Sequence, residues 1–299
     1  MNIIKCRRHN NETITSIQSG FTLIELSIVL VIIGLIVGGI LAGQELIRSA
    51  ELHSIVSQKA QYSIAMNAFR NKYGCLPGDC ATATQLFGVL RGNTSDNYTS
   101  SCYGNNGGTN GTDTCNGDGD GHICSAFGIY YTAVTCNEGI LAWQHLASAG
   151  MIEGNYSPYE QAGVSTNPYE VVGGNIPAAK AKAKTGYSIS FICMNNGYFF
   201  DNGHCAHTFI YGAQDPVNDD NYIGEAAFPA LSAMDAYRID KKIDDGSPAR
   251  GTVTTFTNNG YFQNACSTTD GPTITASTQY PISVTNAPTC ALMFTADGF

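Results

Sequence analysis

The sequence predicts an α+β fold in which one long N-terminal helix packs on a small antiparallel sheet with long, disulfide-stapled loops. Three observations lead to this prediction. An apolar run near the N-terminus continues at helical spacing to Tyr73. Short segments with period-two alternation follow in the second half of the chain. Nearly all cysteines lie beyond the apolar run, among loops rich in Gly, Asn and Thr.

The first element is a membrane-length helix. Residues 26–44 carry no charge and are mostly Ile, Leu, Val and Gly. A helix of that length extends for about 28 Å, close to the hydrocarbon thickness of a bilayer. Lys5, Arg7 and Arg8 precede it, so the positive-inside rule places the leader in the cytoplasm and the remainder outside. One carboxylate, Glu25, stands at the edge of this helix, where an acid is costly and implies a specific role.

Three interpretations of this segment compete. A secretory signal peptide needs a shorter apolar core and small residues before the cut, but a cut after Ala42 places Ile40 at the −3 position. A plain signal anchor leaves Glu25 without a purpose. A cut between Gly20 and Phe21 leaves the helix in the membrane and creates a new amine on Phe21, close to Glu25.

The residues around that cut carry a specific motif. They read Gly20-Phe21-Thr22-Leu23-Ile24-Glu25, followed by Leu26-Ser27-Ile28-Val29-Leu30-Val31-Ile32-Ile33-Gly34-Leu35. This motif resembles the class III signal of type IV pilins and type II secretion pseudopilins. The resemblance implies that a prepilin peptidase cuts after Gly20 and methylates Phe21, and that Glu25 is the assembly glutamate.

The assembly role has a physical basis. When subunits leave the bilayer and pack their helices into a filament, a buried carboxylate needs a cationic partner. The amine of a neighbour's Phe21 can supply it. The chain departs from many family members at Ala42, where they have a helix-kinking proline.

The helix is expected to continue beyond the membrane, because apolar residues keep helical spacing from Glu45 to Tyr73 before Gly74 and Pro77. The predicted organisation is a leader at 1–20, a transmembrane assembly helix at 21–43, an ectodomain part of the same helix at 44–74 and a globular periplasmic or extracellular domain at 75–299.

Further elements are predicted within the globular domain. The expected helices are Ala81–Phe87, Glu138–Ile152 and Ala230–Ile243; the expected strands are a hairpin of Tyr187–Cys193 with Cys205–Tyr211, and Cys290–Phe294. Four pieces, at residues 72–79, 116–121, 138–146 and 236–246, also resemble large, mostly uncharacterised pilin-like proteins. That resemblance extends over most of the chain but implies no ligand.

The cysteines indicate an oxidising compartment. The chain has 11, of which Cys6 lies in the leader and the others beyond the apolar run. No CxxC motif occurs, which argues against a zinc ribbon or a thioredoxin-like site. Spacing favours the pairs Cys75–Cys80 and Cys193–Cys205 and allows Cys266–Cys290; the remaining connectivity stays open.

A calcium loop is predicted at residues 116–123. Oxygens from Asn116, Asp118 and Asp120 recur at alternate positions, Gly121 makes the turn, and the His122 backbone can add a further ligand. Because Phe127 stands where a closing glutamate is expected, Asp113 or Glu138 would have to close the site. The competing interpretation is a solvated Gly/Asp turn. Pseudopilin ectodomains can use calcium structurally, so the resemblance to this family favours a structural Ca²⁺ site over the solvated turn.

Two other clusters have a structural interpretation. His204 and His207 flank Cys205, and we expect a hairpin disulfide there rather than a metal, because in a strand the two imidazoles point to opposite faces. Trp143 and His145 are expected to be core and polar rim rather than a ligand patch. No GxSxG, HExxH or P-loop motif is present, so we expect no enzyme.

The amino-acid composition limits the kinds of partner that we expect the protein to bind. Charged residues make up 13% of the chain and the net charge is −9, so no nucleic acid is expected as a partner. The resemblance implies a single-pass protein of the bacterial inner membrane with a periplasmic C-terminal domain, extracellular once in a pilus. We expect a minor or specialised filament subunit whose partners are the prepilin peptidase and other pilin or pseudopilin subunits. The alternative is a membrane-anchored binding or adhesion module that does not polymerise.

Overall fold

A computed structural model describes residues 21–88, 114–124, 138–156, 170–193, 205–214, 226–257, 265–269, 273–275, 277–282 and 287–296. The chain divides into two compact units, Met1–Ser49 and Ala50–Phe299. The long helix α1 (Leu23–Tyr73) begins in the first unit and ends in the second, with bounds close to the predicted 21–74.

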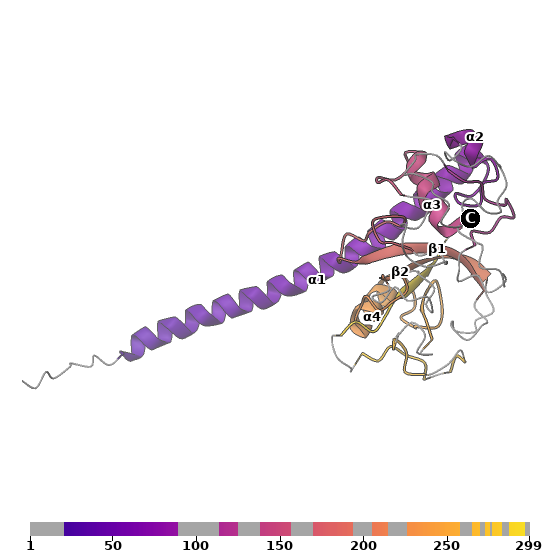
Figure 1. The fold of residues 1–299 in the computed structure, drawn as a ribbon. Coiled ribbons are helices and arrows are strands. Elements are labelled where there is room, and N and C mark those ends of the chain that lie inside the picture. The colour runs from indigo at the N-terminus through magenta and orange to yellow at the C-terminus, as the bar shows by residue number, and fades with distance from the viewer. Residues whose placement is uncertain are drawn as a thin grey trace, which may run out of the picture. The chain divides into compact units, whose positions relative to one another are not determined.

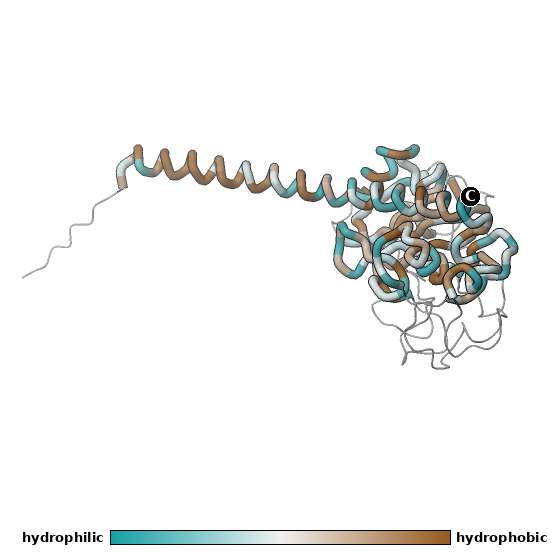
Figure 2. The backbone as a smooth tube through the Cα atoms, turned by 90° about the horizontal axis from the view of Figure 1, so that it is seen from above, coloured by the Kyte–Doolittle hydropathy of each residue, from teal (hydrophilic) through white to brown (hydrophobic). Residues whose placement is uncertain are grey.

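In the first unit, α1 is apolar and uncovered. Figure 2 shows apolar residues concentrated in this part of the helix. Large side chains such as those of Leu23, Leu30 and Leu35 are exposed. By length and composition α1 is able to cross a membrane. Such a surface requires a cover of lipid or of other helices.

In the second unit, α1 forms one side of a hydrophobic core. Its buried face includes Ile55, Tyr62, Met66 and Phe69. The helix α3 (Glu138–Ser148) packs against this face (Figure 1), and the ring of Trp143 meets that of Tyr62 edge-on with 4.9 Å between centroids.

The sheet has four antiparallel strands in the order β1-β2-β4-β3. They are β1 (Thr185–Cys193), β2 (Cys205–Ala213), β3 (Val253–Thr255) and β4 (Leu292–Thr295). The predicted β1–β2 hairpin is present, with Cys193 opposite Cys205 in the register. One long helix on a small antiparallel sheet confirms the predicted α+β class.

Both faces of the sheet are buried. On one face Tyr187 meets Tyr62 of α1, and its hydroxyl donates to the Ile55 carbonyl at 2.9 Å. The opposite face carries small polar side chains, and the Ser188 hydroxyl donates to the buried carboxylate of Glu170. The amide of Ala226 also donates to Glu170, so segments distant in sequence cover the face that period-two alternation usually leaves to solvent.

Three predicted helices are shorter than expected. The helix α4 (Ala233–Ile243) does not begin at Ala230, because the amides of Ala230 and Leu231 donate to the Cys290 carbonyl in an extended segment. Ser232 then caps the helix by accepting from the Asp235 amide.

The helix α3 ends at Ser148 instead of Ile152. Gly150 has a φ of 68°, and the Met151 amide donates to the Leu146 carbonyl in a Schellman-type ending. The short helix α2 (Ala83–Phe87) begins two residues later than predicted.

Candidate functional site

The first candidate site is the start of α1. Phe21 and Thr22 are not helical, and Phe21 is 86% exposed. The predicted cleavage point between Gly20 and Phe21 therefore lies ahead of the first helical residue, Leu23. Gly20 itself lies outside the described residues.

Glu25 caps the helix that carries it. Its Oε2 accepts from the Thr22 amide and from the Thr22 hydroxyl, both at 2.8 Å, and the Glu25 amide donates to Thr22 Oγ1 at 3.3 Å. This is a capping box, in which threonine and glutamate three residues apart satisfy each other's backbone. Within the described part of the chain, Glu25 Oε1 accepts no hydrogen bond, so one carboxylate oxygen stays available to an external donor.

The second candidate site is a group of three carboxylates in the globular domain. Asp79, Asp118 and Glu138 each place one oxygen within 4.8 Å of the others. Asp79 and Glu138 are buried, whereas Asp118 is exposed. Burial raises the pKa of Asp79 to about 6 and that of Glu138 to about 8. Three acids in so small a volume need protons or a cation to offset their repulsion.

Main-chain amides hold these carboxylates in place. Asp79 accepts from Gly119 at 2.7 Å and from Gly121 at 3.0 Å. Glu138, the first residue of α3, accepts from the amides of Asp118 and Cys124, each at 3.0 Å. The 117–124 segment is thereby folded around two side chains that come from elsewhere in the sequence.

Two glycines allow the segments to approach closely. A Cβ at Gly78 would lie 2.3 Å from the Glu138 carbonyl oxygen, and one at Gly117 would lie 2.3 Å from the Gly78 carbonyl oxygen. Neither position has room for a side chain. The disulfide Cys75–Cys80 closes the loop that carries Asp79.

The structure regroups the predicted calcium ligands. Asp118 and Glu138 come together as expected, but the third member, Asp79, is absent from the predicted set. Asp120 lies outside the group, and its carboxylate accepts from the His122 amide at 2.8 Å. The side chain of Asn116 accepts from the Thr84 amide at 2.8 Å and so stabilises the start of α2.

Asp113 lies outside the described residues. Asp79 does not belong to the predicted calcium loop, because it lies in a separate loop far earlier in the sequence. The Pro-Gly-Asp sequence that ends in Asp79, closed by flanking cysteines, was the available signal.

His145 ties three segments together in the core. Its Nδ1 accepts from the Gly78 amide at 2.8 Å, which leaves Nε2–H to donate to the Cys115 carbonyl at 3.1 Å. Burial lowers the pKa of His145 to about 4, so the ring is neutral. Trp143 is a core residue as expected, whereas the prediction of His145 as polar rim is wrong, because its ring is fully buried between these hydrogen bonds.

The remaining cysteine and histidine predictions have mixed outcomes. The structure contains the disulfides Cys75–Cys80 and Cys266–Cys290. Cys205 is also disulfide-bonded, but the side chain of Cys193 lies outside the described part, as does His204. His207 is buried, and its Nε2 accepts from the Ile123 amide at 3.1 Å, which is a structural role.

Comparison with known proteins defines the class of the N-terminal segment. Residues 15–41 match the family model described as the prokaryotic N-terminal methylation motif, the prepilin signal of type IV pilins and pseudopilins. The chain therefore begins with a prepilin-type methylation motif and an apolar helix, which support a type IV pilin-like or pseudopilin precursor. No curated protein and no solved structure matches the chain.

Proposed function

We propose that the protein is a specialised, minor subunit of a type IV pilus-like or type II secretion pseudopilus filament. A prepilin peptidase removes residues 1–20 and methylates Phe21, and α1 holds the mature chain in the bacterial inner membrane with its globular domain in the periplasm. The length of the mature chain and its long loops favour a specialised role over that of a densely packed major subunit.

The observation that supports this proposal most directly is the hydrogen bonding of the Glu25 carboxylate. The carboxylate closes its own capping box through Oε2, yet Oε1 has no donor within the described residues. An amine on Phe21 of a neighbouring subunit can bind that oxygen without breaking the cap. The exposed apolar surface of α1 offers the remaining contact area for helix packing.

Replacing Gly20 by Ala tests the processing step. Glycine is the only residue type without a Cβ, so an alanine at position 20 places a methyl group beside the scissile bond. We expect the wild-type chain to begin at Phe21 with a methylated amine and the Gly20→Ala chain to keep its leader, as measured by mass spectrometry of the intact protein. Ser19→Ala is the matched control, and we expect normal cleavage. A leader removed equally well from the Gly20→Ala chain contradicts the assignment.

We also propose that Asp79, Asp118 and Glu138 bind Ca²⁺ as a structural ion. Calcium takes oxygen ligands, and these carboxylates would contribute three of the six to eight that it usually has. The cation would offset the repulsion between two buried acids and join the 75–80 loop to the 117–124 segment and α3.

Calcium is expected to raise the melting temperature of the mature chain relative to chelator, because the ion binds the folded state only. Asp79→Asn is expected to abolish that shift. Asp120→Asn is the matched control and is expected to retain it, since Asp120 lies outside the group. Thermal unfolding in calcium and in chelator gives the result. Equal melting temperatures for the unsubstituted chain would rule out the site, whereas loss of the shift in Asp120→Asn alone would favour the contiguous loop.

A further inference from the structure

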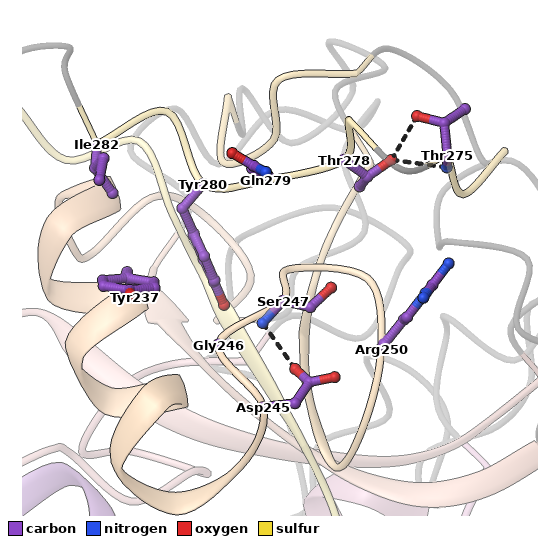
Figure 3. A pocket seen from close by; sticks show the side chains of 10 residues that line it. All are labelled: Tyr237, Asp245, Gly246, Ser247, Arg250, Thr275, Thr278, Gln279, Tyr280 and Ile282. Carbon is purple, nitrogen blue, oxygen red and sulfur yellow. Dashed lines mark hydrogen bonds between the residues drawn. The ribbon is translucent and has the colours of Figure 1, made fainter.

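A cavity of about 450 Å³ lies in the globular domain, and its lining includes no residue of either site described above. It is bounded by α4 with the loop that follows it, and by Thr275, Thr278, Gln279, Tyr280 and Ile282 (Figure 3). In Figure 3, Tyr237 and Tyr280 stand on the α4 side, Arg250 on the opposite side and Gln279 along the upper edge. The volume falls within the range of about 300–1,000 Å³ usual for small-molecule sites.

The walls of this cavity are held by internal bonds. Asp240 is buried and accepts from the Gly246 amide at 2.9 Å and from the Tyr280 hydroxyl at 2.8 Å, which links the two sides. Asp244 accepts from the Val253 amide at 2.8 Å and so closes the loop that carries Arg250. The cavity is therefore formed before any ligand arrives, which lowers the entropic cost of binding.

Several polar side chains at this cavity have no internal partner. Within the described residues, the Arg250 guanidinium, the Gln279 amide and the Ser247 hydroxyl make no side-chain hydrogen bond. Asp245 adds an exposed carboxylate, which among the described residues accepts from the Ser247 amide alone. The cavity thus offers both donors and acceptors within a short distance of one another.

Aromatic and apolar surface accompanies these polar groups. The rings of Tyr237 and Tyr280 lie 6.0 Å apart at an interplanar angle of 64°. Tyr237 is half-buried, Tyr280 is buried behind it, and Ile282 is 46% exposed at the rim. Tyrosine presents an apolar face and a polar tip, which suits a ligand that is apolar on one side and hydroxylated on its edge.

We propose that this cavity binds a neutral sugar residue of a glycan. A pyranose ring has an apolar C–H face, which can pack on the half-buried ring of Tyr237, and a rim of hydroxyls, each of which both donates and accepts. Asp245 can accept from two adjacent hydroxyls, Arg250 donates, and Gln279 does both.

The surroundings argue against other ligands. A phosphate or nucleic acid requires clustered cations, but Arg250 is the one cation among the described lining residues. The carboxylates of Asp240, Asp244 and Asp245 group together beside it, which disfavours an anion. A lipid chain requires an apolar lining, and most of the residues here are polar. A neutral, hydroxyl-rich ligand fits the mixed charge.

Binding to immobilised oligosaccharides tests this proposal on the full mature chain. The chain is purified in a detergent without a sugar headgroup and applied to glycans that end in glucose, galactose or mannose. We expect retention on at least one of them. Gln279→Ala and Arg250→Ala are each expected to lower the affinity about tenfold, because each removes hydrogen bonds to the ligand.

The controls separate binding from folding and from assembly. Gln85→Ala, at an exposed glutamine on α2, is expected to leave the affinity unchanged. Melting temperatures show whether each variant is folded; Arg250 and Gln279 are exposed, so we expect little change. The measurement uses the unassembled chain and does not depend on the filament proposal. Absence of binding at millimolar glycan, or binding that survives both cavity substitutions, would overturn the assignment.

Discussion

Replacing Glu25 by Val is expected to leave the leader cleaved but to remove the subunit from filaments. The substitution deletes the only carboxylate in the apolar N-terminal part of α1, and with it the acceptor for a neighbour's Phe21 amine. Incorporation is measured by immunoblot of sheared or pelleted filaments against the membrane fraction, and cleavage by the mass of the chain. We expect the variant to accumulate in the membrane fraction.

Glu25→Gln separates the two roles of this side chain. Glutamine can still close the capping box with Thr22, but it carries no charge to pair with an amine. We therefore expect Gln to fail in assembly as Val does. If the Gln variant assembles as well as the unsubstituted chain, Glu25 acts by capping α1 and the proposed charge pair is wrong.

Replacing Trp143 by Ala is expected to lower the free energy of unfolding of the globular domain by about 3–5 kcal/mol. The indole is fully buried and contacts Tyr62 of α1 and Phe209 of β2, so its removal opens a cavity where helix and sheet meet. Urea unfolding followed by circular dichroism measures the change, because Trp143 is the sole tryptophan and its fluorescence disappears with it.

Trp143→Phe is the matched control for this packing effect. Within the described residues, Trp143 Nε1 is buried without a hydrogen-bond partner, so Phe removes no bond and keeps most of the apolar contact. We expect a much smaller loss of stability than with Ala. Similar losses in the two variants would mean that the site cannot adjust to a smaller ring, and a loss below about 1 kcal/mol for Ala would contradict the core described here.

The elements with strong local patterns could be predicted from the sequence. The long helix α1 follows from an apolar run and continuous helical spacing, and the β1–β2 hairpin from period-two alternation between cysteines. Errors fell at element ends. The residues that begin at Ala230 favour a helix locally, but a hydrogen bond to Cys290 holds Ala230 in an extended segment. A contact with so distant a residue cannot be read from the local sequence.

The candidate metal site was predicted only in part, for a similar reason. Asp118 and Glu138 were named from a loop pattern, whereas Asp79 approaches from a different loop. Its approach depends on Gly78 and Gly117, whose missing side chains let two backbones pass within van der Waals contact. The cavity beside α4 was not predicted at all, because its lining comes from segments separated in the sequence.

The sequence by itself determined the prepilin signal, the membrane-length helix and the class of fold, because each depends on neighbouring residues or on a simple period. Only the tertiary structure decided which carboxylates meet, why both faces of the sheet are buried, and that the Thr22–Glu25 capping box uses one Glu25 oxygen and leaves the other without a donor among the described residues. These features depend on contacts between distant segments or on side-chain geometry, which a linear pattern does not encode.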